Sequence, residues 1–247
     1  VINSMLSPEQ ANIRRSRIGF FMTELVGKLD PTWEVEVNLI AKKPVQEKES
    51  PKTSDQVTKK ILFLAANPSN LTQVGTGREA ELIKEALRRS DHRDSFEIVT
   101  NHAVTIPGIQ RALLQEKPAI IHFSGHGSNL GKLAFEDAQG NSFEVSPGAL
   151  ADLFELFQGR GIEAVLLNAC YSEAQAKEIG KNIQYVIGMN EEVYDNNSLE
   201  FSRAFYDAIG AGEDIPFAFR LGKNAVSFQS MPESEKPCLL IDGEEQL

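Results

Sequence analysis

Short apolar runs alternate with amphipathic stretches along most of the chain from residue 60 onward. The runs predict buried parallel strands at 61–66, 95–100, 119–123, 163–169 and 184–189. The stretches between and after them predict helices at 79–90, 106–116, 149–158, 173–181, 195–210 and 214–228. Residues 132–146 predict a hairpin with Gln139-Gly140-Asn141 in its turn, and 238–241 is either a last strand or a tail.

Repeated strand–helix–strand units predict an α/β fold whose mainly parallel sheet carries helices on both faces. In such sheets, functional residues gather in the crevice beyond the carboxyl ends of the strands. This rule selects four segments of the sequence: Asn67-Pro68, Ser124–Gly127, Asn168–Ser172 and Met189–Asp195.

The remaining sequence predicts three parts. Residues 1–41 form a small helix-plus-strand extension, which either packs on the main domain or serves as a recruitment module. Residues 42–59 have the polar, charged composition of a linker, and their lysines make the linker a candidate processing site. Residues 60–247 form the main domain.

Two of the four selected segments hold a nucleophile and a base. His126 lies in S-G-H-G and Cys170 lies in N-A-C-Y-S, 44 positions apart, and both strand ends face the same edge of the sheet. An imidazole beside a thiol makes thiolate available and later protonates a leaving amine. The N–H groups of Gly127 and Cys170 are candidates for an oxyanion hole. A lone Cys or a lone His is usually structural, but the pair at two strand ends is far more specific.

The sequence does not match the motifs for nucleotide, phosphate or metal binding. The run G-H-G-S-N-L at 125–130 has Leu130 where a dinucleotide fingerprint needs its third glycine, and Leu133 follows Gly131-Lys132 where a phosphate loop needs Ser or Thr. One Cys and one His are too few for a zinc site, and no acidic cluster has the spacing of a calcium loop. We therefore expect no metal and no cofactor, and a nucleotide-binding domain is the disfavoured alternative.

Composition and charge limit the partners and the cellular compartment that we expect for this protein. The net charge of −10 argues against direct nucleic acid binding, which needs a surplus of Lys and Arg. Two cysteines do not make a disulfide framework, so we expect a reducing, cytoplasmic location. No run approaches the roughly 20 apolar residues of a membrane helix, and the start VINSMLSPEQ lacks the shape of a signal peptide. A start at Val1 suggests a fragment of a longer protein.

Residues from about 60 to about 228 resemble CHAT domains, which belong to the caspase, separase and gingipain group of cysteine proteases. The resemblance lies in ILFLAANP (61–68), IIHFSGHG (120–127), VLLNACYS (165–172) and FSRAFYDAIGAG (201–212). It implies a caspase-like three-layer sandwich and an endopeptidase with His126 and Cys170 as its dyad. Caspases carry Gln two residues before the cysteine. Asn168 stands there in this chain, which puts specificity for Asp in doubt.

The resemblance also implies where the substrate's P1 side chain binds. In the separase-like branch, an acidic residue after the fifth strand receives a P1 Arg, and a carboxylate can pair a guanidinium bidentately. The corresponding segment here is GMNEEVYD, with Asp195 and Glu192 as candidates. Asn67 and Asn168 are further candidates for the pocket lining. The alternative for the two acids is a solvated turn and a helix cap.

CHAT domains resemble effector modules that are often fused to sensor or repeat domains in prokaryotic antiviral defence and programmed death. The resemblance therefore implies an inducible protease that acts on a protein substrate and answers to an activating sensor domain or protein. The alternative is a catalytically silent caspase-like domain that serves as a protein-interaction module. The intact pair of Cys170 and His126 favours the enzyme.

Overall fold

The computed structural model describes residues 58–246, which lie within the compact unit Gln56–Leu247. The predicted extension at 1–41 and all but the end of the predicted linker at 42–59 lie outside the described residues. Both therefore stay predictions.

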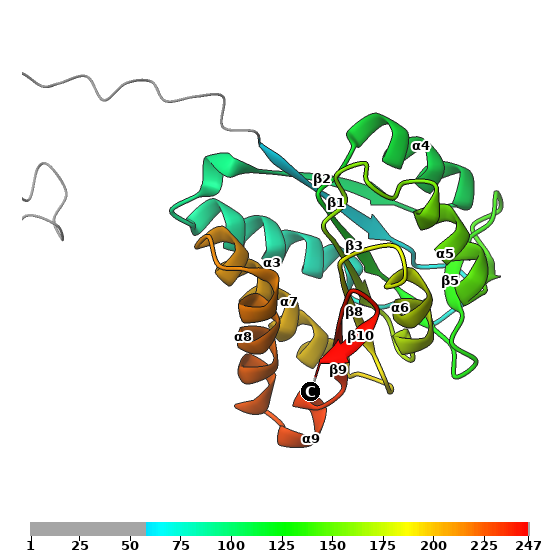
Figure 1. Ribbon diagram of the computed structural model, residues 1–247. Coiled ribbons are helices and arrows are strands. Elements are labelled where there is room, and N and C mark those ends of the chain that lie inside the picture. The colour runs from blue at the N-terminus through cyan, green and yellow to red at the C-terminus, as the bar shows by residue number, and fades with distance from the viewer. Residues whose placement is uncertain (1–57, 247) are drawn as a thin grey trace, which may run out of the picture. The chain divides into compact units, whose positions relative to one another are not determined.

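A seven-stranded sheet runs through the described part of the chain, in the order β10-β9-β8-β7-β3-β1-β2 (Figure 1). The strands from β2 to β8 in this order are parallel, whereas β9 and β10 are antiparallel additions at one edge. Their bounds are β1 (Lys59–Ala65), β2 (Phe96–His102), β3 (Ile120–Ser124), β7 (Ala164–Asn168), β8 (Tyr185–Met189), β9 (Pro237–Ile241) and β10 (Glu244–Gln246).

Helices cover both faces of this sheet, which confirms the predicted three-layer α/β architecture (Figure 1). One layer consists of α4 (Ile106–Glu116), α5 (Pro147–Glu155) and α6 (Glu173–Ile179), and the other of α3 (Thr76–Arg89), α7 (Asp195–Gly210) and α8 (Ile215–Ser227). Two short helical segments, η1 (Arg93–Ser95) and α9 (Met231–Ser234), lie in connections. Across residues 58–246, no helix combines the length and the apolarity needed to cross a membrane.

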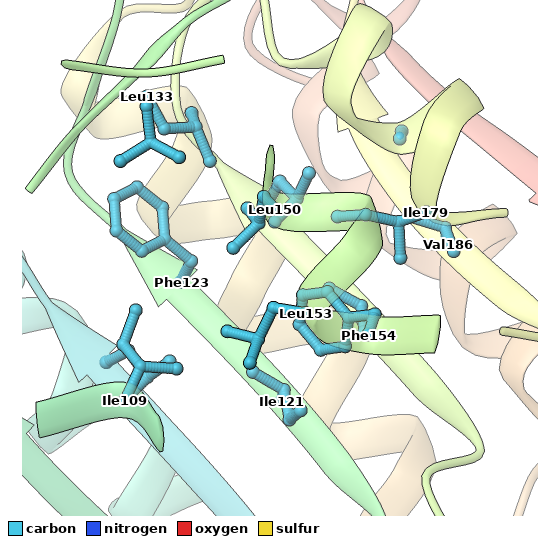
Figure 2. Close-up of a cluster of buried hydrophobic side chains, with 14 of the residues drawn as sticks. Ile109, Ile121, Phe123, Leu133, Leu150, Leu153, Phe154, Ile179 and Val186 are labelled. Atoms are coloured by element: carbon cyan, nitrogen blue, oxygen red, sulfur yellow. The ribbon is translucent and has the colours of Figure 1, made fainter. Parts of the chain in front are cut away.

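Each sheet face supports its own apolar core, which explains the unbroken apolar runs of the central strands. Along β1, Leu62 and Leu64 pack into one core, and Ile61 and Phe63 pack into the other. Successive strand residues point to opposite faces, so a strand buried on both sides shows no polar alternation. Figure 2 shows the core under α4, α5 and α6, where side chains of these helices pack against side chains of the strands. Its labelled residues are Ile109, Ile121, Phe123, Leu133, Leu150, Leu153, Phe154, Ile179 and Val186.

A small antiparallel sheet confirms the predicted hairpin at 132–146 and extends it. Its strands are β4 (His126–Gly127), β5 (Leu133–Glu136) and β6 (Ser142–Val145). The turn is closed by Asp137, whose carboxylate accepts hydrogen bonds from the N–H groups of Gln139 and Asn141, each at 2.8 Å. Because β4 follows β3 directly and pairs with β5, the hairpin fixes the backbone of His126.

Local signals in the sequence set where two helices begin. The Thr105 hydroxyl accepts a hydrogen bond from Gly108 N at 3.2 Å and begins α4. The Asp214 carboxylate does the same for Phe217 N at 2.8 Å and begins α8. Both helices carry proline at N1 or N2, where its missing N–H has no partner to lose.

We expect Gly222→Ala to destabilise the protein, because α8 packs against α7 through this glycine. A Cβ at Gly222 would lie 2.7 Å from Cε2 of the buried Phe201 ring. Such overpacking costs about 1–3 kcal/mol of unfolding free energy, measurable by urea denaturation. The matched control is Gly148→Ala in α5, where a Cβ meets nothing within 4 Å. Equal stability of the two variants would contradict the close α7–α8 packing.

Candidate active site

The parallel pairing of β3 with β7 brings the two predicted reactive residues together. Ser124 at the end of β3 lies in register with Asn168 at the end of β7. His126 and Cys170 each follow two residues later, and both line one cavity at this edge of the sheet. The structure thus brings the two residues of the predicted dyad to one cavity.

The His126 ring is oriented by a backbone carbonyl. Its Nε2 atom lies 2.7 Å from the Thr72 carbonyl oxygen. A carbonyl oxygen only accepts hydrogen bonds, so this contact places the ring proton on Nε2 and leaves Nδ1 as the basic nitrogen. The orienting group is a backbone carbonyl, so the type of residue at position 72 could not reveal it in the sequence.

The segment that carries the Thr72 carbonyl is held from two sides. Asn67 binds Val74 twice: Nδ2 donates to the Val74 carbonyl at 3.0 Å, and Oδ1 accepts from Val74 N at 3.2 Å. Asn70 binds the hairpin turn through both atoms of its amide, at Ser142. Asn67 therefore shapes the loop beside the cavity, and it is not among the cavity-lining residues.

The surroundings of Cys170 favour its neutral thiol form. Its Sγ lies 3.9 Å from the Val193 carbonyl oxygen, and within residues 58–246 no hydrogen bond joins it to His126. Burial raises the pKa of the Cys170 thiol above its ordinary value, and the negative charges of Glu192 and Asp195 raise it further. Both effects disfavour the thiolate form of Cys170.

The turn that carries Cys170 is tightly constrained. Tyr171 has a φ of 55°, in the left-handed region that non-glycine residues rarely adopt. The buried Ser172 hydroxyl donates to the Leu167 carbonyl and accepts from Met189 N, each at 2.9 Å. These bonds tie the ends of β7 and β8 around the nucleophile.

Gly127 lies directly against this turn. A Cβ on Gly127 would lie 1.8 Å from the Cys170 carbonyl oxygen and 3.4 Å from Cys170 N. Only glycine permits this approach, which brings together the backbones of the two residues predicted to form an oxyanion hole.

The predicted P1 residues separate into two groups. Asn168 and Asp195 line the cavity, whereas Glu192 and Asn67 do not. Glu192 is exposed, and its carbonyl oxygen accepts a hydrogen bond from Lys236 Nζ. Asp195 is the first residue of α7, and it is also exposed.

Sequence reasoning missed Glu79, a buried acid in α3 that also lines the cavity. Its carboxylate accepts hydrogen bonds from Asn168 Nδ2, Ser124 Oγ and Ser202 Oγ, each at 2.5 Å. The signal was available: Glu79 stands four residues before Ile83, on the apolar face of an amphipathic helix. An acid on that face needs polar partners in the interior.

Glu79 also contacts the buried His122, which does not line the cavity. Its Nε2 lies 3.0 Å from Glu79 Oε1, and its Nδ1 lies 3.2 Å from the Tyr206 hydroxyl. His122, inside β3, is therefore a buried histidine that hydrogen-bonds in the interior. Burial favours the protonated form of Glu79, but His122 and the hydroxyl donors outweigh it and lower the pKa of this carboxyl below its ordinary value.

We expect Cys170 to be alkylated by iodoacetamide with a midpoint pH above that of an ordinary thiol, because its pKa is raised. Asp195→Asn removes a negative charge, so the midpoint should move down and the rate at pH 8 should rise. Samples quenched at successive times and analysed by mass spectrometry give the alkylation rates of the wild type and of Asp195→Asn at each pH. Cys238 serves as an internal reference, since burial raises its pKa to about 12.

The control for this experiment is Asp152→Asn, which removes an exposed acid of α5 away from the cavity. It should leave the midpoint unchanged. A wild-type midpoint below that of an ordinary thiol would show a resting thiolate–imidazolium pair and contradict the arrangement described above.

Comparison with solved structures shows the caspase-like fold. A secreted C11 cysteine protease from Bacteroides thetaiotaomicron matches with a TM-score of 0.54 at 10% identity, over 75% of this chain and 66% of that one. Caspase-1 from Spodoptera frugiperda matches with a TM-score of 0.52 at 14% identity, over 75% and 86% of the two chains. The Arg-specific cysteine proteinase gingipain R matches with a TM-score of 0.50 at 13% identity, over 74% and 45%.

Two relatives are similar in sequence. A "Roc-COR-CHAT protease" from an unknown prokaryotic organism is 28% identical over 181 residues, which is 71% of this chain and 17% of that protein. A "Probable protease" from Gillisia limnaea is 26% identical over 175 residues, which is 70% and 31% of the two chains. The chain thus spans less than a third of the length of either relative.

The family model for the CHAT domain matches residues 40–227, well over half of the 247 residues. The matched range begins before residue 60, where the sequence predicts the domain to start. With the fold, the cavity and the relatives described above, this match shows that the chain belongs to the CHAT domain family.

Proposed function

We propose that this chain is a cysteine endopeptidase with Cys170 as nucleophile and His126 as general acid and base. One observation carries the proposal: His126, whose Nε2 is held by the Thr72 carbonyl so that Nδ1 is the basic nitrogen, lines the same cavity as Cys170. The related proteins and the solved structures of this fold are proteases, which supports the same reading.

Acylation follows from these positions. When a peptide enters the cavity, the thiol proton moves from Cys170 Sγ to His126 Nδ1, and the thiolate attacks the scissile carbonyl carbon. Negative charge develops on the substrate carbonyl oxygen, and the N–H groups of Gly127 and Cys170 are the donors proposed to receive it. Collapse of the tetrahedral intermediate breaks the C–N bond, and Nδ1–H gives its proton to the leaving amine.

Deacylation reverses the proton path. His126 Nδ1 takes a proton from water, whose oxygen attacks the thioester carbonyl carbon. The C–S bond breaks, the thiolate leaves and regains a proton from Nδ1–H, and a carboxylic acid product is released. The Thr72 carbonyl serves throughout, because it stabilises the imidazolium that forms in each half-reaction.

A basic P1 residue suits this cavity. Its lining includes the carboxyl groups of Asp195 and Glu79, and none of the described lining residues is Lys or Arg. The structural neighbour gingipain R is described as Arg-specific, which agrees with this proposal.

The biological setting we propose is that of an effector. The relative named a Roc-COR-CHAT protease is much longer than this chain, so the protease unit occupies a small part of it. A protease unit joined to larger modules suits an inducible enzyme, which a sensor domain or protein switches on to cut a protein substrate in a prokaryotic defence or death response.

The direct test uses fluorogenic peptides with Arg or Lys at P1. We expect turnover by the wild type, and we expect Cys170→Ala and His126→Ala to lower kcat/KM by a factor on the order of 10⁴ or more. Cys238→Ala removes the other, buried thiol and should retain activity.

Peptide cleavage that survives Cys170→Ala would contradict the assignment of the nucleophile. Silence of the wild type on a full P1 library, even with its activator, would favour the alternative of a protein-interaction module.

A further inference from the structure

The carboxyl group of Glu79 lies at the base of the cavity that holds Cys170 and His126. Its side chain is 3% exposed. It reaches the cavity from α3, between the ends of β3 and β7, and contacts one residue of each strand end: Ser124 and Asn168.

The two oxygens of this carboxylate have different surroundings. Oε1 contacts Asn168 Nδ2 and Ser202 Oγ at 2.5 Å, and His122 Nε2 at 3.0 Å. Among residues 58–246, the donor that reaches Oε2 is the Ser124 hydroxyl, at 2.5 Å. A carboxylate oxygen can accept about two hydrogen bonds, so Oε2 keeps acceptor capacity.

The remaining capacity is on the cavity side. Ser124 and Asn168 line the cavity, whereas His122 and Ser202 are fully buried and do not line it. Three donor groups already surround Oε1, so a hydrogen-bond donor on a ligand in the cavity is accepted at Oε2.

Charge narrows the donor to a cation. A carboxylate shielded from water interacts more strongly with a charge than an exposed one does. Asp195 lines the same cavity, but it is exposed and its field is screened by solvent. No Lys or Arg is among the described residues that line the cavity.

We propose that Glu79 is the specificity-determining residue of this site and accepts a hydrogen bond at Oε2 from a Lys or Arg side chain at P1. The inference rests on the proposed peptidase function and refines it. Asp195, the candidate that the sequence favoured, then contributes long-range attraction at the cavity and not the direct contact.

Glu79→Gln tests this role with little change of shape. The Gln carbonyl can take the place of Oε1 and accept from Asn168 and Ser202. Its amide nitrogen then takes the place of Oε2, and the Ser124 hydroxyl, which is both donor and acceptor, can turn to accept from it. The variant therefore presents an N–H donor to the cavity where the wild type presents an acceptor.

We expect Glu79→Gln to lower kcat/KM for Arg and Lys at P1 by about 10- to 100-fold, the usual cost of a lost charge-assisted hydrogen bond. Cleavage after Gln or citrulline should fall far less, or rise, since their carbonyl oxygens can accept from the new donor. The matched control is Glu81→Gln, which alters an exposed acid on the same helix that pairs with Lys84. It should keep the wild-type profile.

A second measurement needs no variant. Peptides that differ only in Arg against citrulline, or Lys against norleucine, at P1 keep the size of the side chain and remove its charge. The wild type should prefer the charged member of each pair by about 100-fold or more. If Glu79→Gln melts at a much lower temperature than the wild type, its activity cannot be compared directly, and the peptide pairs then test whether the site prefers a charged P1 side chain.

The possible failures are distinct. Equal cleavage of the charged and uncharged members overturns the role of Glu79, and so does a folded Glu79→Gln variant with the wild-type profile; both leave the peptidase intact. If Asp195→Asn loses the preference for Arg and Lys at P1 and Glu79→Gln keeps it, the role belongs to Asp195 and the proposal for Glu79 is overturned. Absence of cleavage after any P1 residue rejects the proposed function together with this inference.

Discussion

The hydrogen-bonded pairing of β3 with β7 is the constraint on which the site depends. Because Ser124 and Asn168 are register partners, the residues that follow them leave the sheet at the same level. His126 and Cys170 meet there, although the chain passes through a hairpin and α5 between them. A register shift by one residue would send each side chain to the opposite face of its strand. The alternating apolar contacts of both faces make such a shift costly.

The buried carboxylate of Glu79 makes that pairing specific. It binds Ser124 on β3, Asn168 on β7 and Ser202 on α7, so three elements are linked through one charged group. Burying a charge is expensive unless donors surround it. The donors around Glu79 keep a buried acid at the cavity that holds the nucleophile. The same group thereby joins the architecture of the site to its choice of substrate.

Much of this arrangement could be predicted from the sequence. The long periodic segments gave the strands and helices of the domain, and the strand-end rule placed Cys170 and His126 together. The uncertain segment at 238–241 is strand β9, whose antiparallel partner β8 lies far away in sequence. The short, exposed β10 has no apolar pattern at all, because it contributes nothing to the core.

The sequence marks Glu79 as an acid on an apolar helix face, but three features of the site could not be predicted from it for physical reasons. The group that orients His126 is the Thr72 carbonyl, and a backbone atom has no residue signature. The role of Glu79 depends on donors from elements far apart in the chain. Asn67 sits at a strand end as the pocket prediction required, yet both atoms of its amide are occupied by Val74. Proximity along the sequence did not determine which polar residues face the cavity.

The central claim is that Cys170 and His126 act as one catalytic unit in a cavity that receives a basic residue. The most direct measurement is covalent labelling of the full chain by a lysyl or arginyl acyloxymethyl ketone, followed by peptide mapping. We expect one adduct, on Cys170, that forms much more slowly in His126→Ala and in the presence of a competing basic peptide. Labelling that proceeds at the same rate without His126, or that goes to Cys238, would contradict the account.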